Sequence, residues 1–377
     1  MKLLFTIIIA LCGQLATAQT TLANGNSSVQ LSGIVQMGYN QRFYDTTLVK
    51  DYKKNRFFLD DARIALSGKV RGKFEYELQV NLADFSKVVI DRGQSAPLIN
   101  AFVDYTAIKN LSIKVGYQRI PFSAASLTPF YYSVWLQRPE IARGDFFARR
   151  DIGVVLKTTQ FNQRLNVEAG AFSGMGEQSL WGDNDASGRL EYGGRIDYSY
   201  PSKFRYRDCD LNGTPVPMVR VGANARYANK RSATGPTYLM KTIDGEKLLY
   251  GADVAFQYQH FTAQAEFVQA KLSHRTLTSS EVQYNTPYTM AGGINAQLTY
   301  TVPSIKSCFA VRYDNFNPSD LIIGDLVSTA SIGYAYFIND YRTVLRAHYF
   351  KRLNEATTFT GQGYTDDQVR FAIQFMF

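Results

Sequence analysis

The last ten residues, QVRFAIQFMF (Gln368–Phe377), alternate between large apolar side chains and smaller or polar ones. In an extended strand, successive side chains point to opposite faces, so one face would carry Val369, Phe371, Ile373, Phe375 and Phe377. Ending on such a strand exposes Phe377 at a fraying terminus unless neighbouring structure holds it. The segment therefore predicts a strand with one apolar and one wet face, held by pairing with another strand.

The same period of two recurs along most of the chain. It covers residues 29–40, 58–70, 74–82, 98–106, 111–119, 151–158, 165–173, 189–200, 218–227, 248–258, 261–269, 286–300, 308–314, 326–337, 342–350 and 368–377. A chain of 377 residues could hold two or three domains, but no charge run, low-complexity stretch or Pro/Gly/Ser-rich linker divides it. The pattern predicts one all-β unit of about 16 strands.

The links between these stretches alternate between long and short. Short links such as those at 71–73 and 109–110 follow long ones such as 41–57 and 83–97, and only the link at 201–217 is long where a short one is expected. Outer-membrane barrels sort their connections in this way, with short periplasmic turns and long extracellular loops. Many tyrosines also lie near strand ends on the apolar parity, as in the aromatic girdles of membrane proteins. We therefore expect a transmembrane antiparallel β-barrel.

The N-terminus has the features of a secretory signal peptide. Lys2 precedes the apolar run LLFTIIIALC, and Ala16-Thr17-Ala18 fits a cleavage site, so residues 1–18 form the predicted signal and 19–377 the barrel domain. The mature chain would keep Cys209 and Cys308, which we expect to be free thiols because their strands are far apart in order. The net charge of +9 is spread along the chain, which argues against a nucleic-acid partner.

Three stretches resemble the phosphate-selective porin O and P family. They are DARIALSGKVRGKFEYELQVNLADF, LSIKVGYQRIPFS and ARRDIGVVL, within residues 58–160; the remainder agrees in alternation, length and terminal Phe. The resemblance implies a sixteen-stranded, trimeric porin in the outer membrane of a Gram-negative bacterium. It also implies a water-filled channel for small hydrophilic solutes that is either general or prefers anions, and we expect a preference for anions such as phosphate.

The loop after the fifth strand, residues 120–150, is the candidate constriction. In the resembled family this loop folds into the barrel, and here it carries Arg138, Arg143, Arg149 and Arg150 against Glu140 and Asp145. With Arg63 and Arg119 from the resembling motifs, these arginines form our predicted anion pathway. Convergent arginines at a narrow point favour anions. The alternative is an extracellular loop with solvated arginines.

Two other functions remain open from the sequence. A substrate-specific uptake channel would share every feature described above. An outer-membrane hydrolase would need a histidine near Ser or Asp, but His260, His274 and His348 show no triad spacing. We expect no enzyme activity, no cofactor and no metal, with outer-membrane lipid and small solutes as partners.

Overall fold

The computed structural model describes residues 20–43, 55–84, 97–142, 147–181, 188–230, 245–274, 286–354 and 367–377. The predicted signal peptide, residues 1–18, lies outside the described residues, and so does Arg143 of the predicted anion pathway.

The described residues form seventeen strands and a few short helical turns. The strands are β1 (Thr20–Asn24), β2 (Ser27–Phe43), β3 (Asn55–Val70), β4 (Phe74–Asn81), β5 (Leu98–Ile108), β6 (Leu111–Arg119), β7 (Arg150–Gln160), β8 (Leu165–Phe172), β9 (Glu191–Tyr200), β10 (Met218–Lys230), β11 (Gly245–Tyr258), β12 (Phe261–His274), β13 (Tyr288–Val302), β14 (Ser307–Asn317), β15 (Val327–Asn339), β16 (Thr343–Arg352) and β17 (Asp367–Met376). The helical turns are α3 (Ala124–Leu127), η1 (Phe130–Tyr132), η2 (Glu140–Ala142), η3 (Gly176–Trp181) and η4 (Pro303–Ile305).

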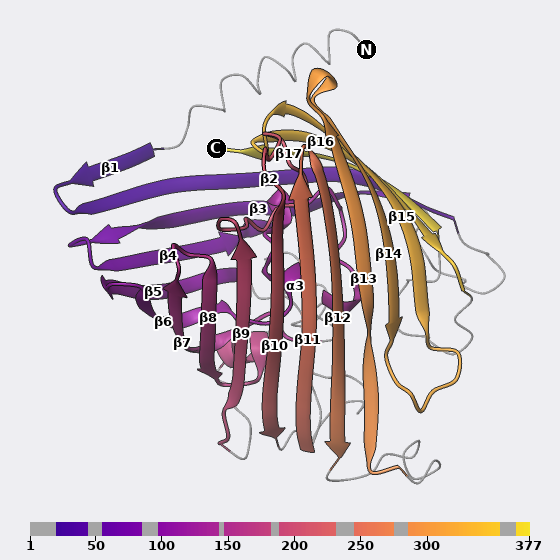
Figure 1. The fold of residues 1–377 in the computed structure, drawn as a ribbon, viewed down its shortest axis with the longest axis horizontal. Coiled ribbons are helices and arrows are strands. Elements are labelled where there is room, and N and C mark those ends of the chain that lie inside the picture. Colours follow the sequence, from indigo (N-terminus) through magenta and orange to yellow (C-terminus); the bar gives the residue numbers. More distant parts are fainter. Residues whose placement is uncertain are drawn as a thin grey trace.

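The strands β2 to β17 close into a barrel of sixteen (Figure 1). Each pairs antiparallel with the next along the chain, and β17 returns to pair with β2 from Asp367↔Phe43 to Met376↔Ile34. All sixteen predicted strands are therefore confirmed, with ends that differ by a few residues. The short strand β1 was not predicted; it pairs with residues 27–31 of β2, beyond the point where β17 ends.

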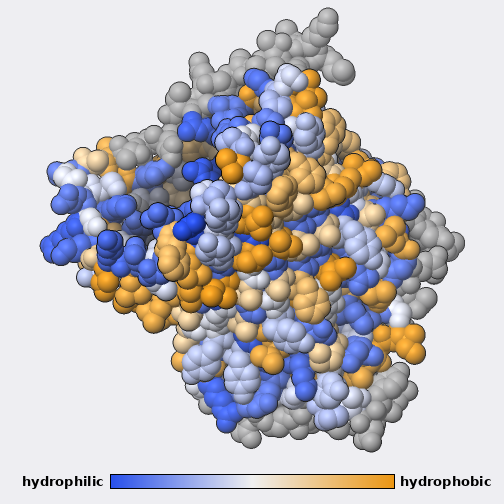
Figure 2. Space-filling model, in the orientation of Figure 1, coloured by the Kyte–Doolittle hydropathy of each residue, from blue (hydrophilic) through white to orange (hydrophobic). Residues whose placement is uncertain are grey.

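Side chains alternate between an apolar outer face and a polar inner face. On β14, Val311 is 50% exposed and Arg312 is 3% exposed; on β15, Ile332 is 61% exposed and Ser331 is 3% exposed. In the space-filling view, apolar residues gather in a zone across the strands, and hydrophilic residues concentrate nearer the rims (Figure 2). This arrangement is the reverse of a water-soluble fold and suits a barrel surrounded by lipid.

The two rims differ in their connections, as the sequence predicts. Six short turns lie at one rim, at residues 71–73, 109–110, 161–164, 259–260, 303–306 and 340–342. One of the two-residue turns, Gln259-His260, has positive φ at both residues, as a two-residue hairpin with the twist of its strands requires. The long link 201–217 belongs to this rim, which we call the short-turn rim. None of the described helices is long and apolar enough to cross a membrane.

The seam between β2 and β17 leaves no room for a side chain at Gly38. A Cβ at this position would lie 2.1 Å from the carbonyl oxygen of Phe371 on β17 and 2.6 Å from the ring of Phe58. At the end of the seam, the N–H of Gly33 donates to the carbonyl of Phe377 (2.8 Å), and the N–H of Phe377 donates to the carbonyl of Gly33 (3.0 Å). The terminal residue is thus held by the strand pair that closes the barrel, which answers the problem posed by its exposed position.

We predict that Gly38→Ala weakens barrel closure. The new methyl group must push against the backbone of β17, and overpacking of this kind costs about 1–3 kcal/mol. The temperature at which the folded band disappears in heat-modifiability gels should therefore fall. The matched control is Gly194→Ala, whose Cβ would meet its nearest atom at 3.2 Å. Equal melting of the two variants would contradict the steric role of Gly38.

Candidate functional site

The segment between β6 and β7 turns back into the barrel. Three arginines on the inner faces of β14, β16 and β17 donate to its backbone carbonyls: Arg312 to Gln137 (2.9 Å), Arg346 to Tyr131 (2.9 Å) and Arg370 to Leu136 (3.3 Å). A buried carbonyl left without a partner costs about 1–3 kcal/mol, so these bonds fix the path of the segment. The described part of the predicted constriction loop therefore lies against the inner wall. That it forms the narrowest point of the channel stays a prediction.

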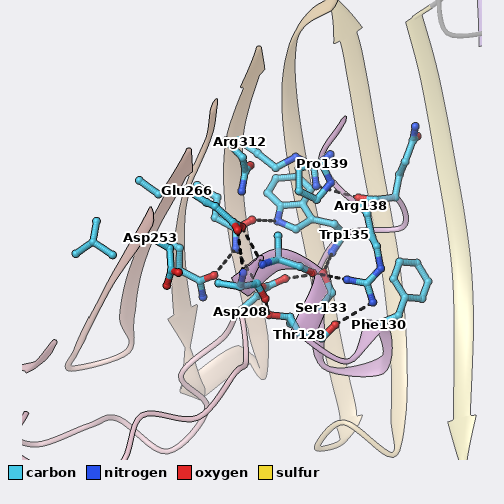
Figure 3. Close-up of a pocket in the computed structure, with 18 of the residues that line it drawn as sticks. Thr128, Phe130, Ser133, Trp135, Arg138, Pro139, Asp208, Asp253, Glu266 and Arg312 are labelled. Atoms are coloured by element: carbon cyan, nitrogen blue, oxygen red, sulfur yellow. Dashed lines mark hydrogen bonds between the residues drawn. The ribbon is translucent and has the colours of Figure 1, made fainter. Parts of the chain in front are cut away.

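Trp135 is the main apolar anchor of this segment (Figure 3). Its side chain is 2% exposed, its Nε1 donates to Gln297 Oε1 at 2.7 Å, and the guanidinium of Arg312 lies 4.5 Å from its ring. At the start of α3, Glu266 of β12 accepts hydrogen bonds from the backbone N–H groups of Ala124 (2.8 Å) and Ala125 (2.9 Å). The segment is thus attached to the wall from β12 to β17.

The link 201–217 enters the barrel from the short-turn rim and meets this segment. Asp208 accepts hydrogen bonds from the hydroxyl of Ser133 (2.5 Å) and the N–H of Val134 (3.1 Å). It also accepts one from the amide of Gln297 on β13 (2.9 Å). Burial raises the pKa of Asp208, and the bonds from Ser133 and Gln297 counter that rise by stabilising the charged form. The two segments therefore brace each other inside the barrel.

These two segments divide the lumen unevenly. On the side of β10–β14, a cavity of about 30 Å³ lies between the wall and the segments, lined by Glu266, Asp208 and Arg312 among others (Figure 3). On the side of β2–β8, a cavity of about 730 Å³ extends from residues of the short-turn rim, such as Asn212 and Phe377, to Arg119 and Tyr131. Of these two cavities, the second is the one large enough for a hydrated solute.

Five of the six predicted pathway arginines lie close enough together to interact electrostatically, and two of them line this larger cavity. Arg63 comes from β3, Arg119 ends β6, Arg138 lies in the inward segment, and Arg149 and Arg150 lead into β7. Arg119 and Arg150 are direct partners in the β6–β7 ladder, and Arg63 and Arg119 both line the cavity. We call these five residues the arginine cluster. The sixth, Arg143, lies outside the described residues.

Hydrogen bonds hold the members of the cluster in place. Arg119 donates to the carbonyl of Leu127, and Arg138 donates to the carbonyls of Ala125 and Thr128. Arg150 donates to Asn100 at 3.2 Å, and the Asn100 amide in turn donates to Glu77 at 2.6 Å. Arg119 therefore ties the inward segment to β6, Arg138 joins two parts of that segment, and Arg150 links β7 to β5, while the charges remain close together.

Like charges surround Arg138. Burial lowers its pKa well below the ordinary value, and the charges of Arg149, Arg119, Arg150 and Arg63 lower it further. A guanidinium stays protonated at neutral pH, so the repulsion persists as positive potential at this point. An anion that enters the cluster would relieve that repulsion, because an opposite charge within a few ångströms favours the charged form.

Most other charges on the inner wall are neutralised in pairs. The pairs are Arg195 with Asp253 (2.7 Å), Arg220 with Asp253 (3.1 Å), Arg226 with Glu191 (2.6 Å), Lys247 with Glu191 (3.0 Å), Lys157 with Glu168 (2.8 Å) and Arg312 with Asp314 (2.8 Å). In the arginine cluster, Arg63 pairs with Asp61 (2.6 Å). Among the described residues, neither Arg119 nor Arg150 forms an ion pair with a carboxylate. The charges of Arg119 and Arg150 are therefore not neutralised by a direct ion pair among these residues.

Several basic residues that line the larger cavity were not among the predicted pathway residues. Arg207 of the link 201–217 lines it and lies 4.6 Å from the ring of Tyr132. Lys114 and Lys157 line it from β6 and β7. The alternation places both lysines inward but does not distinguish them from other wall charges. No sequence signal places Arg207 in the lumen, because a link at the short-turn rim is expected to stay outside.

The histidines do not form a hydrolase site in the part of the chain that the structure describes. His260 lies in a short turn, with Nδ1 3.0 Å from the carbonyl oxygen of Asp210. His348 packs edge-on against Trp135, with ring centroids 5.1 Å apart. The side chain of His274 lies outside the described residues.

Comparisons with known proteins place this barrel in a family. The model of the family described as phosphate-selective porin O and P matches residues 29–377. Comparison with curated protein sequences gives no match.

Solved porin structures share the fold at low sequence identity. An anion-selective porin from Comamonas acidovorans is 13% identical, with a TM-score of 0.61 over 93% of this chain and 100% of that one. OmpT of Vibrio cholerae is 10% identical, with a TM-score of 0.59 over 95% and 100%. The channel DcaP of Acinetobacter baumannii is 13% identical, with a TM-score of 0.57 over 94% and 99%. By its family match, and in agreement with this fold, the chain belongs to the phosphate-selective porin O and P family and is an outer-membrane porin, a channel rather than an enzyme.

Proposed function

We propose that this porin is a diffusion channel for small hydrophilic solutes that prefers anions such as phosphate. The observation that carries the proposal is the arginine cluster of Arg63, Arg119, Arg138, Arg149 and Arg150, two of which line the open cavity. In this proposal, the described part of the segment between β6 and β7 narrows the channel and brings Arg138 to the cluster. The family's name and the anion selectivity of the Comamonas porin agree with this proposal.

The placement of charge matters more than its total. A contact between unit charges in water is worth only about 1 kcal/mol, so charges scattered over a wide lumen discriminate weakly. Where ions must pass close to several cations, the same charges set selectivity. Guanidinium groups also bind phosphate oxygens in a bidentate manner, which a chloride ion cannot match.

Three further features remain part of the proposal. Residues 1–18 would be cleaved as a signal peptide, so that the mature chain begins at Gln19. The barrel would assemble as a homotrimer in outer-membrane lipid, as the family resemblance implies. A substrate-specific uptake channel is the closest alternative function, and transport measurements distinguish it from a general porin.

We predict anion preference in planar bilayers. Under a KCl gradient, the reversal potential of the purified protein should have the sign of chloride selectivity, because the arginine cluster admits chloride more readily than potassium. Added phosphate should lower the chloride conductance by occupying the cluster. A reversal potential with the sign of potassium selectivity would refute the proposal.

We predict that the double variant Arg149→Gln/Arg150→Gln loses most of this preference. Glutamine keeps much of the side-chain volume and removes only the two charges from the cluster. The anion-to-cation permeability ratio should fall about fivefold, the factor that corresponds to ~1 kcal/mol. Block of the chloride current by phosphate should weaken as well. The measurement is the reversal potential of channels that show normal heat-modifiability.

The control for this variant is Lys73→Gln/Lys109→Gln. Both lysines are exposed in short turns at the opposite rim, so the control removes the same charge far from the cluster. Its selectivity should stay near that of the unmodified protein. An equal loss in both double variants would show that a diffuse positive field, rather than the cluster, determines selectivity.

A further inference from the structure

The link 201–217 is the one connection at the short-turn rim, among the described residues, that folds into the lumen. Its backbone is held by the wall and by neighbouring turns. Thr299 donates to the carbonyl of Asp208 (2.6 Å), Tyr341 donates to the carbonyl of Cys209 (2.8 Å), and the N–H of His260 donates to the Asp210 carboxylate (3.1 Å). The link therefore carries its central residues against the inner face of β13, β14 and the 340–342 turn.

This folding brings two cysteines together. The sequence holds three cysteines, and Cys12 lies in the predicted signal peptide, so Cys209 and Cys308 are the two that the mature chain would keep. Cys209 is 2% exposed and Cys308 is 0% exposed. Both are free thiols in the structure, and both belong to one buried cluster with residues such as Tyr341 and Val344. Both thiols are free in the structure, as predicted, but the distance between their positions along the chain does not keep them out of one cluster.

The environment of the two thiols makes them slow to react once the link is in place. Burial raises the pKa of Cys209 well above its ordinary value, and the adjacent thiol of Cys308 and the charge of Asp208 raise it further. Thiolate is the reactive form of cysteine, and a buried thiol with a raised pKa is inert. Any covalent change at this pair must therefore occur while the link is still accessible, during assembly of the barrel.

We propose that Cys209 and Cys308 form a disulfide that fastens the link 201–217 to β14 inside the barrel. The compartment in which such a barrel assembles is oxidising. A thiol–disulfide oxidoreductase of that compartment, or another disulfide donor, is the oxidant. The Cys209–Cys308 S–S bond forms as the S–S bond of the donor breaks, and the two thiol protons and two electrons pass to the donor, which leaves as a dithiol.

The disulfide would hold more than the link. Asp208, next to Cys209, binds Ser133 and Val134 of the inward segment, so the link braces that segment from the short-turn side. Arg207 lies on the other side of Asp208 and lines the open cavity. A covalent bond at Cys209 would therefore fix both the brace and a cavity-lining arginine. This inference concerns the link alone and does not depend on anion preference.

The test uses the full-length protein from outer membranes lysed in N-ethylmaleimide. The protein is unfolded in SDS, the excess reagent is removed, and polyethylene-glycol maleimide is added with or without prior reduction. We expect no gel shift without reduction and a shift by two labels after it, together with an intact mass about 2 Da below that of the dithiol. Failure to form two label sites after reduction, or a band that runs as a dimer without reduction, would overturn the proposal.

The control variants are Cys209→Ser and Cys308→Ser. Each should fold, because serine is close in size to cysteine, and each should leave one thiol blocked by N-ethylmaleimide and resistant to later labelling. Trypsin should cut the single variants faster than the unmodified protein at Lys203 and Arg205, which are exposed in the link. Equal cleavage of the variants and the unmodified protein would show that no bond fastens the link.

Discussion

The structure depends on closing a sheet that would sit in lipid. Lipid offers no partner for an unpaired N–H or C=O group, so every strand edge must find another strand. The pairing of β17 with β2 meets this requirement, and it explains why the chain ends on an apolar strand with Phe377 bonded to Gly33. A barrel of sixteen strands leaves an interior too wide to be filled by its own side chains. The remaining features of the molecule follow from how that interior is occupied.

Two segments from opposite rims occupy the interior: the inward segment between β6 and β7, and the link 201–217. The backbone N–H and C=O groups of each need hydrogen-bond partners inside the lumen. Arginines of the wall provide them for the inward segment, as Arg312 does for Gln137 and Arg346 for Tyr131. Asp208 joins the two segments to each other. The larger cavity lies beside β2–β8, and Arg63 and Arg119 of the arginine cluster line it. Asymmetric filling thus determines where solutes can pass.

The sequence predicted the strands of the barrel wall better than it predicted the segments that lie inside the lumen. Alternation places all sixteen strands, because burial on one face and lipid on the other require a period of two. The sequence also predicts that Arg119 lies near Arg149 and Arg150, because these residues stand at the two ends of one loop. The inward course of the link 201–217 was not, because it depends on contacts with residues far along the chain, such as Thr299 and Tyr341. The short strand β1 was missed because five residues show too little alternation.

The positions of charged side chains in the lumen were also not predictable from the sequence alone. Along the strands, inward basic and acidic residues nearly balance, which by itself argues for weak selectivity. In the structure, carboxylates such as Asp253 and Glu191 neutralise arginines and lysines of the β9–β11 wall. In the arginine cluster, Arg63 pairs with Asp61, whereas Arg119 and Arg150 form no ion pair with a carboxylate among the described residues. Guanidinium groups bonded to carbonyls and carboxylates therefore organise the lumen, and the arginines held among like charges are the ones on which the proposal of anion preference rests.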